Sequence, residues 1–173
     1  MKTANKLIML ITVVMVFSGC SSLRTASDFD SKTNFSNFKT YDFYEKGMAR
    51  LKLNDLDKRR MVNAIETEMA AKGFSKSSKP DLLVNLVVVG REVNEIYNNA
   101  AMWGWRYPFW GGNMATVNQF TEGTIIIDFL DPMQKKLIWH GLGQGFNLDN
   151  FNKREERMQK GVNEILAQYP PKQ

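Results

Sequence analysis

The sequence predicts an α+β domain in which a mostly antiparallel sheet carries two helices on one face, in the order ββαβββα. Segments rich in β-branched and aromatic residues are joined by short turns, which is typical of antiparallel sheets. Two other segments repeat apolar residues at the spacing of an amphipathic helix. The chain of 173 residues is long enough for one domain, and it contains no internal repeat that would indicate a second one.

The first two expected strands are short and lie in an aromatic region. One begins at Asp28, and residues 39–43 alternate polar and aromatic side chains, which is the period of a half-buried strand. We expect the aromatic side chains here to pack in the core, with a ligand surface as the alternative. They are Phe35, Phe38, Tyr41 and Phe43.

Residues 54–72 and 152–169 are the two expected helices. Each begins with an asparagine that is followed three residues later by an acid, the arrangement of a capping box, and Gly73 supplies a left-handed stop after the first. Both carry an apolar stripe that should face the sheet. The caps are Asn54 with Asp57 and Asn152 with Glu155, and the stripes are Met61, Ile65 and Met69 in the first helix and Met158, Val162, Ile165 and Tyr169 in the second.

Three longer strands are expected between the helices, over residues 81–96, 122–130 and 136–146. The first is apolar on both faces, so it should lie centrally in the sheet. Pro132 fits the second position of a turn that joins the other two. The glycines of residues 141–145 match neither a phosphate-binding loop nor a dinucleotide-binding motif, so they indicate bulges or close approach of the backbone.

The N-terminus has the regions of a secretory signal peptide. Lys2 and Lys6 provide positive charge before residues 7–17, a nearly unbroken apolar run. This run is shorter than the roughly 20 apolar residues that a helix needs to cross a bilayer. We therefore expect a signal peptide over residues 1–19 and not a permanent transmembrane anchor.

Phe17-Ser18-Gly19-Cys20 resembles the lipobox of bacterial lipoproteins, although Leu is commoner than Phe at the first position. The resemblance implies cleavage between Gly19 and Cys20 and a thioether-linked diacylglycerol on the cysteine sulfur, with palmitate among the expected acyl chains. Residues 20–27 are then a lipidated tether, and residues 28–173 are the folded domain. Cys20 is the only cysteine, so no intramolecular disulfide can form.

The expected location is the cell envelope, with the chain anchored to a membrane through the lipid on Cys20. In bacteria with two membranes, an aspartate at the second mature position resembles a signal for retention in the inner membrane. Ser21 occupies that position here. We therefore expect the outer membrane, with the domain facing the periplasm.

The charge of the chain does not indicate a nucleic-acid partner. The formal net charge of +5 falls to +3 without Lys2 and Lys6, and the remaining basic residues are scattered. The only tight basic run, residues 58–60, lies on an expected helix, where a solvated face is the simple interpretation. Nucleic-acid binding requires a concentrated basic face, which the sequence lacks.

A long segment, residues 97–118, separates the first two long strands and contains three of the four tryptophans among glycine, asparagine and proline. Loops of this length in compact domains are usually functional or disordered. Contact with a protein partner, contact with a membrane interface and packing onto the sheet are the alternatives. The residues expected to make such contacts are Trp103, Trp105, Arg106, Tyr107, Phe109 and Trp110.

Groups for catalysis or metal binding are scarce, so we expect no enzymatic activity, catalytic residue, metal site or cofactor. His140 is the only histidine, and it is interpreted as a structural or surface residue. No Gly-x-Ser-x-Gly motif marks a nucleophile. Glu122 and Asp128 are six residues apart and share a face of one strand, so an uncharacterised hydrolase that uses both acids is a weaker alternative.

Several short stretches of the mature chain carry a family resemblance. They are DFD at 28–30, FSNFKTY at 35–41, AKGF at 71–74, PDLLV at 80–84, EGTIIID at 122–128 followed by Asp131, LIWHG at 137–141 and YPP at 169–171. Together they resemble the bacterial lipoprotein family of the domain of unknown function 4136. His140 departs from the pattern, because the family more often has arginine after the tryptophan. The resemblance implies an envelope lipoprotein with an α+β domain and no established activity, catalytic residue or cofactor.

The leading functional hypothesis is a non-enzymatic, lipid-anchored envelope lipoprotein that meets a protein partner through residues 97–118. It rests on a tryptophan-rich segment in an anchored domain without catalytic groups. The alternative is a periplasmic domain that binds a small molecule or a lipid between the sheet and the helices.

Overall fold

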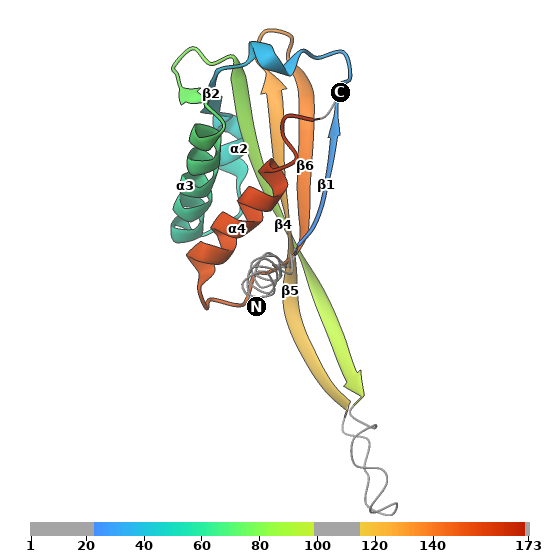
Figure 1. The fold of residues 1–173 in the computed structure, drawn as a ribbon. Coiled ribbons are helices and arrows are strands. Elements are labelled where there is room, and N and C mark those ends of the chain that lie inside the picture. The colour runs from blue at the N-terminus through green and yellow to red at the C-terminus, as the bar shows by residue number, and fades with distance from the viewer. Residues whose placement is uncertain (1–22, 99–114, 172–173) are drawn as a thin grey trace, which may run out of the picture.

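The structure is a computed structural model that describes residues 23–98 and 115–171, and its centre is a six-stranded sheet (Figure 1). The strands lie in the order β1-β6-β5-β4-β2-β3. They are β1 (Arg24–Phe29), β2 (Thr40–Phe43), β3 (Ser75–Lys76), β4 (Leu82–Asn98), β5 (Ala115–Asp131) and β6 (Lys136–Asn147), accompanied by the 3-10 turn η1 (Phe35–Asn37) and the helices α2 (Glu45–Arg50), α3 (Asp55–Ala71) and α4 (Arg154–Leu166).

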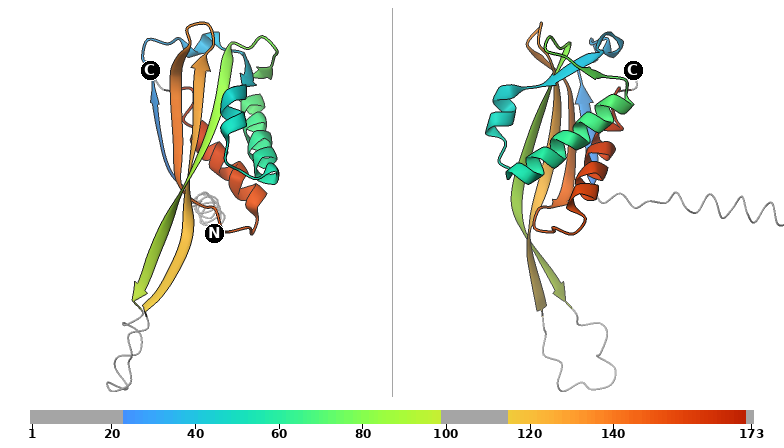
Figure 2. Two further views of the ribbon diagram at one scale, coloured as in Figure 1. Left: turned by 180° about the vertical axis from the view of Figure 1, so that it is seen from behind. Right: turned by 90° about the vertical axis from the view of Figure 1, so that its left-hand side faces the viewer.

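The two long helices, α3 and α4, pack together over one face of the sheet, while the short α2 lies beside β4 (Figure 2). The α+β class is therefore confirmed. Both predicted apolar stripes are buried between helices and sheet. Of the predicted core aromatics, Phe35 and Tyr41 are buried, and Phe38 and Phe43 are partly buried against the same core.

The sheet is mixed, so the prediction of a mostly antiparallel sheet was wrong. β2 pairs in parallel with both β3 and β4, whereas the other neighbours are antiparallel. The predicted order also lacked α2 and the short β3. The reason is the connection from β2 to β4, which runs through α2 and α3 instead of a turn and so returns the chain in the same direction.

The start of α3 matches its prediction, and the start of α4 does not. The Asn54 side chain accepts a hydrogen bond from the Asp57 backbone N–H at 2.9 Å, and Gly73 adopts φ +83° after the helix. α4 instead begins at Arg154, after Lys153 in a left-handed conformation and without a side-chain cap. The predicted capping box at Asn152 was therefore wrong.

The glycines of β6 have the two uses that their pattern indicated. A Cβ on Gly141 or Gly143 would lie 2.9 Å from a side-chain carbon of Ile165, so these glycines let α4 approach the sheet closely. Gly145 has φ +98° and lies at a shift in the β5–β6 register, as expected for a bulge. The β5–β6 turn also contains Pro132, as predicted.

Two predicted boundaries move because strands extend further than expected. β1 begins at Arg24, inside the predicted tether of residues 20–27. β4 continues to Asn98 and β5 starts at Ala115, so both strands enter the predicted loop of residues 97–118. The predicted signal peptide and Cys20 lie outside the described residues. Within the described ranges, no helix combines the length and apolar character needed to cross a bilayer.

Candidate functional site

The most distinctive feature of the molecule is a two-stranded arm made of residues 91–98 of β4 and 115–122 of β5. The register of the two strands continues without interruption to Asn98 opposite Ala115. On the other side of β5, pairing with β6 ends at Glu122 opposite Asn147. Past that pair, in the part of the chain that the structure describes, no further strand joins the arm, which projects from the sheet (Figure 1).

The base of the arm is held by the segment that follows β6. The Leu148 N–H donates to the Thr121 carbonyl at 2.9 Å, and the Thr121 N–H donates to the Asp149 carboxylate at 2.6 Å. Gly90 and Gly123 are paired where the arm begins, and a Cβ on either would meet the Leu148 side chain at 3.3 and 2.9 Å. The two glycines therefore make room for Leu148.

The residues predicted to contact a partner or a membrane lie outside the described residues. They are Trp103, Trp105, Arg106, Tyr107, Phe109 and Trp110. The structure does describe the strands on both sides of them, which pair up to Asn98 and Ala115 at the end of the arm. Residues 99–114 thus connect the two strands where the arm ends.

A buried ion pair, which sequence reasoning missed, links the starts of α3 and α4. The Arg154 guanidinium donates to both carboxylate oxygens of Asp57, from Nε at 2.9 Å and from Nη2 at 2.8 Å. Its Nη1 donates to the Leu148 carbonyl at 2.7 Å. The hydrogen bonds from Arg154 lower the pKa of Asp57, with help from Asn54 and Arg60 and against the effect of burial. The pair therefore also positions the segment at the base of the arm.

A second polar group crosses three strands on the sheet face opposite α3 and α4. His140 Nδ1 lies 2.6 Å from Asp128 Oδ1, and the Asn85 amide donates to the other oxygen of Asp128 at 3.2 Å. The three residues are register partners, so the contact follows from strand pairing. His140 is thus a partner of Asp128 in the sheet, and only the register, which the sequence does not show, could have revealed the pair.

The two acids of the hydrolase alternative are not brought together. Glu122 forms an ion pair with Arg91 at 2.6 Å, whereas Asp128 contacts His140 and Asn85. Six residues of extended strand separate them by about 20 Å, beyond the roughly 5–9.5 Å of catalytic carboxylate pairs in glycosidases. Residues 23–98 and 115–171 also contain no group of three or more side chains suited to hold a metal ion.

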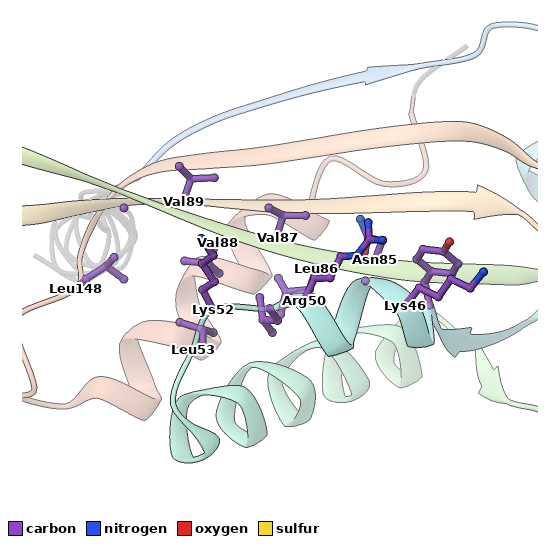
Figure 3. Close-up of a pocket in the computed structure, with 14 residues that line it drawn as sticks. Lys46, Arg50, Lys52, Leu53, Asn85, Leu86, Val87, Val88, Val89 and Leu148 are labelled. Atoms are coloured by element: carbon purple, nitrogen blue, oxygen red, sulfur yellow. The ribbon is translucent and has the colours of Figure 1, made fainter.

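A groove of about 700 Å³ runs between α2 and β4, and we refer to it as the α2–β4 groove (Figure 3). Gly47 of α2 lies against the side chain of Asn85, where a Cβ would come within 1.8 Å of Oδ1. Leu148 contributes from the base of the arm. The walls combine apolar residues of both elements with three cations, Lys46, Arg50 and Lys52.

Comparisons with known proteins identify the family of this fold. A profile described as Domain of unknown function (DUF4136) matches residues 25–171. A PDZ domain protein from Parabacteroides distasonis is similar in structure, with a TM-score of 0.56 and 17% identity over 87% of this chain. This chain spans only 36% of that protein's chain. No curated protein matched.

Two crystal forms of the PelC dodecamer from Paraburkholderia phytofirmans are more distant. One has a TM-score of 0.47 and 10% identity over 87% of this chain and 100% of PelC. The other, a PelC variant, has a TM-score of 0.42 and 8% identity over 83% of this chain and 95% of PelC. At such identities, the likeness to the PDZ domain protein concerns the fold alone, and the PelC matches carry no functional argument.

Proposed function

The chain belongs to the family of the domain of unknown function 4136, and on this basis we propose that it is a lipid-anchored lipoprotein of the bacterial cell envelope that acts as a non-enzymatic interaction module. In this proposal the arm carries residues 97–118 to a protein partner. The lipid on Cys20 holds the domain at the outer membrane, on its periplasmic side.

The observation that carries the proposal is the arm itself. An isolated two-stranded ribbon is at best marginally stable in water, because it buries little apolar surface. Residues 92–98 and 115–121 nevertheless continue the β4–β5 pairing beyond the last pair of β5 with β6. Both edges of such a ribbon present unpaired backbone groups, which another protein can cover. A partner that docks along the arm would pair with these edges.

The anchor is supported by the sequence before β1. Cys20 is four residues before Arg24, the first residue of β1, and a fully extended chain covers at most about 3.6 Å per residue. The folded domain would therefore begin within about 14 Å of the lipidated residue. Such a short connection supports a domain that works close to the membrane surface.

The anchor is tested by Cys20→Ser in cells that are fed a fatty-acid analogue. We expect the variant to lose labelling completely and to remain an uncleaved precursor, because only the thiol can accept the diacylglycerol. Ser22→Ala is the control and should be labelled and cleaved like the parent chain. Labelling that persists in Cys20→Ser would contradict the lipobox.

The partner is tested by photo-crosslinking in cells, with probes placed singly at Trp103, Trp105 and Trp110. We expect a discrete crosslinked protein from at least one of these positions. Lys58 on α3 is the control position, and it should not give that product. Crosslinks to lipid alone, or the same products from Lys58, would contradict a protein partner for residues 97–118.

A further inference from the structure

The α2–β4 groove lies along a part of the β4 edge that has no neighbouring strand among the described residues. β2 pairs with β4 only up to Phe43 opposite Val84, and the chain then leaves the sheet to form α2. The last backbone hydrogen bond on this edge runs from the Tyr44 N–H to the Val84 carbonyl at 2.8 Å. Across the described ranges, no strand lies beside this edge of β4 after Val84.

The free edge presents a row of backbone groups to the groove. Backbone groups of alternate residues in a strand point to the same side, so Leu86, Val88 and Gly90 direct theirs the way Val84 does. These three residues also line the groove. Leu86 is fully buried, so Val88 and Gly90 carry the backbone groups that a partner can reach. An open strand edge of this kind is a template for another strand. Residues 88–90 cover about 7 Å along the strand, enough for a segment of roughly three residues.

The opposite wall of the groove is apolar with a cationic rim. Leu51, which is buried, and Leu53, which is partly buried, line the groove. Leu148 lies near the end away from Asn85 (Figure 3). The three cations among the lining residues, Lys46, Arg50 and Lys52, are all exposed, and the ion pairs and side-chain hydrogen bonds of the described chain do not involve them. Among the described residues that line the groove, none is acidic.

We propose that the α2–β4 groove binds an extended, acidic polypeptide segment of a partner protein, which adds to the edge of β4 at residues 88–90 as a new strand. The open edge supplies main-chain hydrogen bonds, the apolar wall receives alternate side chains, and the cations attract carboxylates. An acyl chain would use the apolar wall and would leave the row of backbone groups unpaired, which is why a polypeptide fits better. The proposal requires neither the lipid anchor nor residues 99–114.

The first test uses a fluorescein-labelled peptide of alternating glutamate and valine, and its affinity for the purified full chain is measured by fluorescence anisotropy. We expect Arg50→Glu/Lys52→Glu to weaken binding about tenfold or more, because both cations become repulsive. The matched control is Lys39→Glu/Lys79→Glu, which makes the same change of charge at two exposed lysines that do not line the groove. The control should bind within about twofold of the parent chain.

The second test changes the peptide and leaves the protein intact. Two further peptides carry N-methyl groups on all glutamate amides or on all valine amides. In an extended strand these two sets of N–H groups point to opposite edges, so only one set can bond with β4. We expect one methylated peptide to bind about tenfold or more weakly and the other to bind like the parent peptide. Equal affinities for all three peptides would overturn strand addition.

Two other results would also overturn the proposal. One is equal weakening by the groove variant and its control, which would show a non-specific effect of charge. The other is a chain that does not bind the peptide but does bind phosphatidylcholine vesicles that contain phosphatidylglycerol, when Arg50→Glu/Lys52→Glu abolishes the vesicle binding. That result would make the groove a site for anionic lipid. The crosslinks from Trp103, Trp105 and Trp110 should persist in this variant, so the two proposals can fail separately.

Discussion

The β4–β5 pair is supported in two different ways along its length, and the change occurs at the paired glycines Gly90 and Gly123. On the side of these glycines that lies within the sheet, β5 has β6 as a second neighbour and β4 has β2 beside its first residues. The helices α3 and α4 cover one face of this half. The helix-facing side chains there are fully buried, among them Leu86 and Ile127 at 0% exposure. Beyond the contacts of Thr121 and Glu122 with the end of β6 and the segment after it, the described parts of the two strands pair only with each other.

The two halves share the same strand pairing and differ in the neighbouring strands and helices that cover them. Both halves have the same antiparallel register, so their main-chain hydrogen bonds are equivalent. Net stabilisation by a backbone hydrogen bond is only about 1 kcal/mol, whereas burying a large apolar side chain contributes about 1.5–3 kcal/mol. The covered half has this burial at its helix-facing side chains. Among the described residues the arm lacks the neighbouring strand of the covered half, so it is the part most easily reshaped by a partner.

The largest expected contrast is in amide hydrogen exchange. Amides of β4 that bond to β5 should exchange on the order of 10³-fold more slowly at Asn85 and Val87 than at Val93 and Glu95. The reason is that the covered half opens only with global unfolding, which costs about 5–15 kcal/mol, whereas the arm opens locally. Mass spectrometry or NMR of the full chain measures the ratio. Equal protection in both halves would show that the arm is stabilised by contacts outside the described residues.

The second contrast concerns the buried ion pair beneath the covered half. Asp57→Asn should lower the free energy of unfolding by about 3–5 kcal/mol, because it leaves the buried Arg154 without a counter-charge. Urea denaturation measures the loss. Asp55→Asn changes an exposed acid in the same first turn of α3 and should cost no more than about 1 kcal/mol. Similar losses in the two variants would mean that Arg154 is satisfied by its carbonyl partners alone.

The third contrast uses pH on the same ion pair. Hydrogen bonds from Arg154 lower the pKa of Asp57 in the folded state. The ionised Asp57 side chain therefore contributes fully to the free energy of unfolding above the unfolded carboxyl pKa of about 3.9. The contribution is lost as pH falls through the lower, folded-state pKa. The stability gap between the parent chain and Asp57→Asn should therefore be widest at pH 7 and shrink below pH 4. A gap of the same size at pH 3 and pH 7 would contradict this linkage.

The smallest contrast is at the base of the arm, where an ion pair is exposed instead of buried. Arg91 and Glu122 are 2.6 Å apart, but the Arg91 side chain is 77% exposed. Arg91→Ala should therefore change the free energy of unfolding by no more than about 1 kcal/mol. Exchange of the neighbouring arm amides should increase, since the pair holds the two strands locally. Urea denaturation and hydrogen exchange of one sample provide both readouts. A loss of unfolding free energy as large as that of Asp57→Asn would contradict the distinction between the exposed and the buried ion pair.

Local chemistry determined several features that can be read along the chain. The Asn54 cap, the Gly73 stop and the apolar stripes of α3 and α4 depend on residues within one or two turns of each other, so their patterns were sufficient. The same holds for the β5–β6 turn and for the glycines of β6, whose pattern predicted a β-bulge or close approach of another element to the backbone. The α+β class follows from these local patterns together.

Tertiary structure alone decided which distant segments meet. Asp57 and Arg154 are 97 residues apart, and Asp128 contacts His140 only because the register of two strands aligns them. The parallel pairing of β2 and the free edge of β4 likewise depend on where α2 and α3 return the chain. Periodicity and capping report the neighbours along the helix or strand, whereas strand order, register and buried charge pairs minimise the free energy of the whole domain. The local sequence patterns therefore determined the long helices and strands, and tertiary packing decided which strand edge stays free, which charges pair and where the groove forms.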